Sequence, residues 1–179
     1  CPGVTPAWND VEQVQFFGID KADMSKKDPS RFQEPHRSTD SERQYRTELE
    51  DYFTRSIGSN VEKLQNFAKY VPVQDARKFL ARYEIFKRIE GIHGSIFECG
   101  VLFGGGVMSW ALLSEIFEPL NHLRNIVGFD TFSGFTTFAA EDKTAWHDGV
   151  KETQAKVGGL SINSHDDIQE SIRLYDKNR

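Results

Sequence analysis

Acidic and glycine residues that suit ligand binding lie in two short stretches of the chain, 95–117 and 125–135. In the first stretch, Glu98 ends a short apolar segment and Gly100 opens a glycine-rich turn. In the second, Asp130 ends another apolar segment. Glycine lets a ligand approach the backbone, and a carboxylate accepts the two hydroxyl groups of a ribose. These residue types predict a pocket for a nucleoside with an anionic arm.

The elements needed to bring these residues together are a strand, a turn, a helix and a second strand. Ser95–Phe97 is short and apolar, and the glycines on both sides of it favour a buried strand. Gly104–Gly106 opens the apolar run Val107–Phe117, which has the length of a helix. The free N–H groups at a helix start suit a carboxylate or a phosphate. The pattern predicts an α/β fold, the start of a doubly wound Rossmann-like sheet with its ligand beyond the carboxyl ends of the strands.

The spacing of the glycines weakens two common nucleotide sites. A dinucleotide site has the pattern G-x-G-x-x-G with an acid about 20 residues later. This chain has G-x-x-x-G-G-G, and Asp130 lies farther from Gly100 than that. A phosphate-binding loop needs Gly-Lys-Ser/Thr, and no lysine occurs between Gly94 and Asp142. A nicotinamide-type Rossmann oxidoreductase therefore stays an alternative, as does a non-catalytic helical interaction module.

The two motifs together carry a family resemblance. Glu98–Gly105 (ECGVLFGG) and Asp130–Phe135 (DTFSGF) resemble the paired motifs Glu-x-Gly-Val-x-x-Gly-Gly and Asp-Ser/Thr-Phe-x-Gly of the macrocin O-methyltransferase-like family. That family consists of class I S-adenosylmethionine-dependent enzymes that methylate sugar hydroxyls. The resemblance covers the chain from Lys69 onward and is greatest to bacterial deoxyhexose 3-O-methyltransferases. It implies an O-methyltransferase whose substrate is a small-molecule sugar or a nucleotide-sugar.

The resemblance also implies which residues contact S-adenosylmethionine. Glu98 would face the ammonium of its methionine end, the glycine amides would face the carboxylate, and Asp130 would bind the ribose. Tyr70, in a segment upstream of these motifs, would make its contact through the backbone. The full set of implied cofactor-binding residues is Tyr70, Val71, Glu98, Cys99, Gly100, Val101, Leu102, Gly104, Asp130, Thr131, Phe132, Ser133, Gly134 and Ser164.

Each of these assignments has a structural alternative. Glu98 could only cap the turn after its strand, and the three glycines could start a helix without a ligand. Asp130 at a strand end could bond its own backbone in a turn. Ser164 precedes two acidic residues at a predicted helix start, which is the usual setting of an N-cap. For Cys99, we expect a small buried residue rather than a nucleophile, because no paired base can be identified in the sequence.

The chain divides into three predicted parts. Residues 1–40 are polar and rich in proline, which predicts an extended arm. Residues 41–92 predict an N-terminal helical cap, with a first helix that has Ser41 as its N-cap and runs to Ile57, and further helices from Asn60 to Ala68 and from Asp75 to Glu90. Their amphipathic faces suit core packing, a cover over the cofactor and part of a homo-oligomer contact. Residues 93–179 predict the cofactor-binding half of a methyltransferase domain, ending after the second strand and a helix from Ser164 to Tyr175.

The substrate pocket and the catalytic groups are not found in this sequence. The resemblance implies that the general base, and the acidic ligands of a divalent cation such as Mg²⁺, lie on strands beyond Arg179. We therefore name no catalytic residue and no metal ligand, and expect the chain to be a fragment that is inactive alone.

Composition excludes several partner classes. Lys and Arg number 22 against 27 Asp and Glu, so the net charge of −5 gives no attraction to nucleic acid. No run of apolar residues is long enough to span a membrane, and no secretory leader is recognisable. Hydrophobic residues make up 38% of the chain, enough for one core. These features predict a cytoplasmic enzyme.

Overall fold

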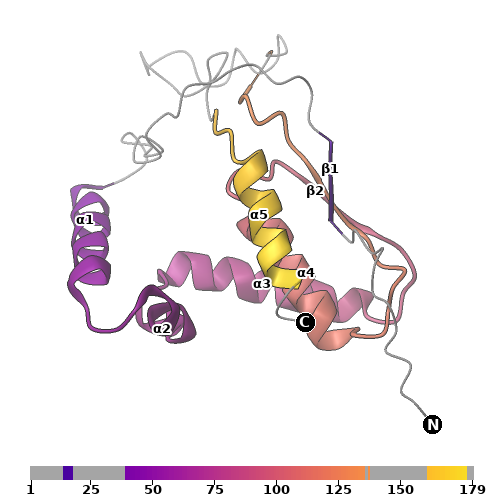
Figure 1. The fold of residues 1–179 in the computed structure, drawn as a ribbon, viewed down its shortest axis with the longest axis horizontal. Helices are drawn as coiled ribbons and strands as arrows, with labels where there is room; N and C mark the ends of the chain where they lie inside the picture. The colour runs from indigo at the N-terminus through magenta and orange to yellow at the C-terminus, as the bar shows by residue number, and fades with distance from the viewer. Residues whose placement is uncertain (1–13, 18–38, 136, 138–160, 177–179) are drawn as a thin grey trace. The chain divides into compact units, whose positions relative to one another are not determined.

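The protein, represented by a computed structural model, is described for residues 14–17, 39–135, 137 and 161–176. Figure 1 shows the helices and strands along the chain. The chain divides into two compact units. The first unit contains residues 1–27 and 82–179, and the second contains residues 28–81. Their boundary lies within helix α3 (Val73–Ile89), so the C-terminal part of this helix belongs to the unit that contains the sheet.

The second unit is helical. It contains α1 (Asp40–Arg55), α2 (Asn60–Gln65), the short 3-10 helix η2 (Phe67–Lys69) and the N-terminal part of α3. None of the helices in the described parts of the chain is long and apolar enough to cross a membrane.

The N-terminus of α1 differs from the sequence prediction by two residues. Thr39, not Ser41, is the N-cap, and its hydroxyl accepts a hydrogen bond from the backbone N–H of Glu42. The Glu42 carboxylate accepts one in return from the backbone N–H of Thr39, which completes a capping box. At the other end the helix stops at Arg55, so Ile57 lies outside it and is 90% exposed. The prediction that Ile57 packs on the helix face was therefore wrong.

Lys63 holds the C-terminus of α1 in place. Its side chain is buried, and its ammonium donates to the backbone carbonyl of Phe53 at 2.5 Å and lies 3.5 Å from that of Thr54. The last carbonyls of a helix lack intrahelical partners and carry partial negative charge. A lysine in this position therefore satisfies them and compensates the charge at the helix end.

The first unit contains a parallel sheet. Strands β2 (Ile96–Cys99) and β3 (Ile126–Phe129) pair in parallel, as the sequence predicts for a doubly wound α/β fold. A third strand, β1 (Val14–Phe17), pairs in parallel with the other edge of β3, giving the order β1-β3-β2. Strand β1 was not predicted. It lies within the stretch predicted as an extended arm, most of which is outside the described residues.

One face of this sheet carries the core. Helices α4 (Gly105–Phe117) and α5 (His165–Asp176) pack on that face, and the Tyr175 hydroxyl donates to the Ala111 carbonyl at 3.2 Å. The buried cluster consists of Val101, Val107, Ala111, Ile126, Phe132 and Ile168. On the opposite face Phe97, 64% exposed, stacks on Phe129 with ring centroids 6.0 Å apart. Because Val101 and Phe132 of this cluster come from the loops after β2 and β3, packing on this face positions the two loops.

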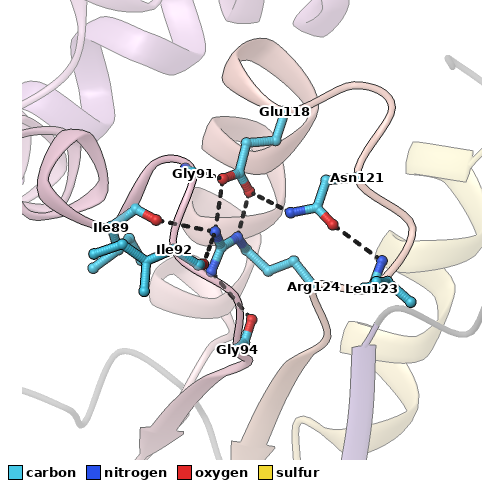
Figure 2. Close-up of polar contacts among 8 residues, drawn as sticks. All are labelled: Ile89, Gly91, Ile92, Gly94, Glu118, Asn121, Leu123 and Arg124. Atoms are coloured by element: carbon cyan, nitrogen blue, oxygen red, sulfur yellow. Dashed lines mark hydrogen bonds and ion pairs between the residues drawn. The ribbon is translucent and has the colours of Figure 1, made fainter.

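A buried ion pair ties the helices to the amino ends of these strands (Figure 2). The side chain of Arg124 is only 2% exposed and donates to both carboxylate oxygens of Glu118. It also donates to the backbone carbonyls of Ile89, Ile92 and Gly94 at 3.0–3.1 Å. A single guanidinium therefore joins the end of α3, the end of α4 and the segment that leads into β2.

The carboxylate of this pair is well satisfied. The hydrogen bonds from Arg124 lower the pKa of Glu118, and those from the backbone N–H of Gly91 and the amide of Asn121 act in the same direction. A lowered pKa in the folded state means that the stabilisation is complete above the ordinary Glu pKa of about 4.3. It is lost as the pH falls through the lowered value.

We predict that Arg124→Met lowers the free energy of unfolding by about 3–5 kcal/mol, because Glu118 is left buried without its countercharge. The matched control is Arg173→Met. Arg173 pairs with Glu170 on the surface of α5, where the two side chains are 52% and 54% exposed, so its loss lowers the free energy of unfolding far less. Urea unfolding of both variants measures the difference, and equal losses would contradict the structural role of the buried pair.

Candidate functional site

The two sequence motifs meet at the carboxyl ends of β2 and β3. Cys99 is in register with Phe129, and the backbone N–H of Gly100 donates to the Phe129 carbonyl at 2.8 Å. The loops that follow the two strands therefore start side by side. Glu98, on β2, and Asp130, directly after β3, therefore lie at the carboxyl ends of neighbouring strands. Ligands bind at this position in open α/β folds.

Asp130 joins the two loops through three backbone hydrogen bonds. One carboxylate oxygen, Oδ2, accepts from the N–H groups of Val101 at 2.8 Å and Leu102 at 2.9 Å. The other, Oδ1, accepts from the N–H of Phe132 at 2.8 Å. Asp130 therefore does bond backbone groups, as the structural alternative to a ligand contact expects. Three of the four acceptor positions of the carboxylate are filled in this way, and the one that remains, on Oδ1, can accept from one hydroxyl; the predicted ribose contact stays a prediction.

Both loops contain a residue in the left-handed backbone region. Leu102 has φ 53° and Phe132 has φ 52°, a conformation that costs a residue with a side chain about 1–2 kcal/mol. Leu102 is fixed on both sides, because its N–H donates to Asp130 and its carbonyl accepts from the Ser164 hydroxyl. Phe132 is held by Asp130 and by burial in the core. The surrounding structure therefore maintains the strained loop shape.

Ser164 lies between α5 and the glycine-rich loop. Its carbonyl accepts from the N–H of Ile168 at 2.9 Å, as expected for a residue that precedes a helix. Its buried hydroxyl, however, donates to the Leu102 carbonyl across the space between the two elements. This contact was not predicted from the sequence. The predicted position near an adenine is untested.

The loop after β3 closes into a tight turn. The Thr131 hydroxyl donates to the Gly134 carbonyl at 2.7 Å and accepts from the N–H of Ser133 at 3.4 Å. The sequence DTFSG therefore forms a preformed loop beside the glycine-rich turn, which is the place predicted to surround an adenosine.

The carboxylate of Glu98 lies against the first turn of α4. Its side chain is 16% exposed, and Oε2 is buried without a hydrogen-bond partner. Oε1 lies 3.5 Å from Nη2 of Arg82. A Cβ atom at Gly106 would lie 1.8 Å from Oε1, so only glycine leaves room for the carboxylate there. At Gly105 a Cβ would meet nothing within 4 Å.

An unsatisfied carboxylate oxygen in a buried position requires an explanation, since nearly all buried polar groups have a partner. The helix beside it has Gly104 as its N-cap and therefore no side-chain cap, so N–H donors and a carboxylate acceptor lie close together. This combination is complementary to a group that carries both an ammonium and a carboxylate. The amino-acid end of a ligand fits that description.

Tyr70 and Val71 belong to the second unit. The Tyr70 ring packs on Tyr52 and Phe53, with ring centroids 5.8 and 5.1 Å away, and its hydroxyl shares a hydrogen bond with Ser56 that lowers the pKa of Tyr70. The side chain thus has a packing role within the helical unit. The cofactor contact predicted for this segment stays a prediction.

Two features of the site were not predicted correctly. Cys99 is exposed rather than buried, because alternation along β2 directs it to the same face as Phe97. Of the three consecutive glycines, sequence reasoning selected Gly104 and not Gly106, and it did not select Arg82. Within residues 14–17, 39–135, 137 and 161–176, no group of three or more His, Cys, Asp or Glu side chains is arranged to bind a metal ion.

Comparisons with solved structures place the fold among methyltransferases. The crystal structure of CalS11, a calicheamicin methyltransferase, matches 84% of this chain with a TM-score of 0.66 and 24% sequence identity. The apo structure of CalS11, described as a TDP-rhamnose 3′-O-methyltransferase, matches 59% with a TM-score of 0.52 and 28% identity. The chain spans about half of CalS11, 55% of the chain in the first structure and 47% in the second. No protein-family profile and no curated protein match the chain.

We predict that Asp130→Ala releases the two loops. The N–H groups of Val101, Leu102 and Phe132 lose a charged acceptor, worth about 1.5–3 kcal/mol, so their amide hydrogens exchange at least about tenfold faster. The amide of Gly100, which bonds to the neighbouring strand instead, serves as the internal control. Exchange measured by NMR decides the question, and parental rates at all three amides would show that Asp130 does not hold the loops.

Proposed function

We propose that this chain is the cofactor-binding part of an S-adenosylmethionine-dependent O-methyltransferase. The observation that carries the proposal is the buried, unpartnered Oε2 of Glu98 beside the glycine-rich start of α4. S-adenosylmethionine ends in an amino acid, whose ammonium and carboxylate match the acceptor and the donors found there. The likeness in fold to a known methyltransferase supports the same assignment.

Residues of the two loops bind different parts of the cofactor. Glu98 binds the ammonium, and the backbone of the glycine-rich turn binds the carboxylate. Asp130 binds the ribose while its hydrogen bonds keep the turn in shape. The remaining proposed contacts are made by Cys99, Gly100, Val101, Leu102 and Gly104 at the methionine end, by Thr131, Phe132, Ser133, Gly134 and Ser164 around the adenosine, and by Tyr70 and Val71.

The bound cofactor supplies an electrophilic methyl group on a sulfonium. The contribution of this chain is to hold that group in one orientation, because positioning two reactants provides much of the rate acceleration in a bimolecular transfer. The hydrogen bonds to Leu102 and the packing of α4 against α5 make the binding loop rigid before the cofactor arrives. None of the described residues is proposed as the general base or as a ligand of Mg²⁺.

The proposed substrate is a hydroxyl group of a deoxyhexose carried on a nucleotide. Two observations support it: the ECGVLFGG and DTFSGF motifs, and the 28% identity to a TDP-rhamnose 3′-O-methyltransferase. Because the chain covers about half of that protein, the acceptor pocket is assigned to the full-length protein and not to any residue described above.

We predict that the protein binds S-adenosylhomocysteine more tightly than NAD, as measured by calorimetric titration. In the Gly106→Ala variant, the added methyl group displaces the Glu98 carboxylate, and the dissociation constant for S-adenosylhomocysteine rises at least about tenfold. Leu112→Ala, which shortens an exposed side chain farther along the same helix, is the control and leaves the affinity unchanged. Tighter binding of NAD, or equal effects of the two alanines, would contradict the proposed site.

We also predict that the full-length protein transfers a methyl group from S-adenosylmethionine to a TDP-deoxyhexose faster than to the free deoxyhexose. The physical reason is that binding energy from the nucleotide fixes the sugar hydroxyl near the methyl group. Mass spectrometry of the products measures the transfer. A protein that binds S-adenosylhomocysteine but methylates neither sugar would retain the cofactor assignment and refute the sugar substrate.

A further inference from the structure

Arg82 lies between the carboxylate of Glu98 and the ring of Trp110. Its Nη2 is 3.5 Å from Oε1 of Glu98, and its guanidinium carbon is 5.9 Å from the centroid of the Trp110 ring. The three side chains come from α3, β2 and α4, and all belong to the first unit. Arg82 is thus the cation that the fold brings to the proposed ammonium-binding residue.

The start of α4 is shaped to admit this pair. Gly106 and Trp110 are four residues apart and lie on the same face of the helix. A Cβ atom at Gly106 would lie 1.8 Å from the Glu98 carboxylate and 2.7 Å from Nη2 of Arg82. The missing side chain at Gly106 therefore leaves space for the anion and the cation together, while the Trp110 ring one turn later supports the guanidinium.

Arg82 compensates the charge of the Glu98 carboxylate without forming a hydrogen bond to it. The side chains of Glu98 and Arg82 are 16% and 26% exposed, so the carboxylate is largely removed from water and needs a countercharge. A separation of 3.5 Å supplies that countercharge but exceeds the 2.7–3.2 Å range of N–H···O hydrogen bonds. Arg82 thus neutralises Glu98 without occupying Oε2, which stays available as an acceptor.

We propose that Arg82 is a positioning residue that holds the Glu98 carboxylate against the start of α4, with Oε2 directed to the ammonium of the ligand. It acts through Glu98 and does not contact the cofactor. This inference rests on the proposed function, since it assigns the ammonium to the amino-acid end of S-adenosylmethionine. Nothing in the sequence motifs points to Arg82, because it lies on the preceding helix.

The test uses two ligands that differ only at the amino-acid end. S-adenosylhomocysteine carries both the ammonium and the carboxylate of that end, and 5′-methylthioadenosine lacks both; the double-mutant cycle with Glu98 then assigns the effect to the ammonium side. In the full-length protein, Arg82→Gln raises the dissociation constant of S-adenosylhomocysteine about tenfold and changes that of 5′-methylthioadenosine by less than about twofold. Unchanged binding of the second ligand also shows that the variant is folded. Arg88→Gln, an exposed arginine on the same helix, is the matched control and changes neither affinity.

A double-mutant cycle separates positioning from direct contact. If Arg82 acts through Glu98, then Arg82→Gln has no further effect on S-adenosylhomocysteine binding in a Glu98→Gln background. Arg82→Lys keeps the charge but not the planar group over Trp110, so it retains part of the affinity.

Three outcomes overturn the inference. Equal loss of both ligands shows a general structural role, additive losses in the cycle show direct contact with the cofactor, and unchanged affinity shows no role. If the unmodified protein binds 5′-methylthioadenosine and not S-adenosylhomocysteine, the ammonium assignment is wrong and this inference is wrong with it. If it binds neither, the proposed function itself fails.

Discussion

Three backbone N–H groups converge on one carboxylate, that of Asp130, and the shape of the candidate site depends on this interaction. Two of them belong to the glycine-rich loop and one to the loop after β3. Leu102 and Phe132 adopt unfavourable backbone angles that these bonds help to maintain. Since strained backbone persists only where the surroundings enforce it, the carboxylate stabilises a binding surface that the loops would not form by themselves.

The two ends of the same strands differ in how their polar groups are satisfied. At the amino ends, Arg124 and Glu118 are buried and fully engaged with each other and with backbone groups, which is the pattern of a stabilising cluster. At the carboxyl ends, Glu98 has a buried oxygen without a partner and a cation that is too far away for a hydrogen bond. The first cluster has the arrangement of a group that maintains the fold, whereas the second is the one proposed to bind a ligand.

The glycine-rich turn contributes through individual positions. At Gly100 the backbone has φ 82° and a side chain would meet no atom within 4 Å, so a ligand can approach it. At Gly106 the space is already filled by the carboxylate and the guanidinium that meet there. The turn therefore combines an open surface for the ligand with a closed contact that fixes Glu98, and replacing either glycine would affect a different part of the site.

The sequence by itself determined the α/β class, the two parallel strands with the helix between them, and the meeting of Glu98, the glycines and Asp130. Those features follow from local patterns, namely apolar segments, the glycines that bound them, and the acidic residues at their ends. It did not determine strand β1, the triple acceptor role of Asp130, the contact of Ser164 with Leu102, or the selection of Gly106 and Arg82. These depend on which distant segments pack together, because a hydrogen bond or an ion pair between residues far apart in the chain leaves no periodic signal in the sequence.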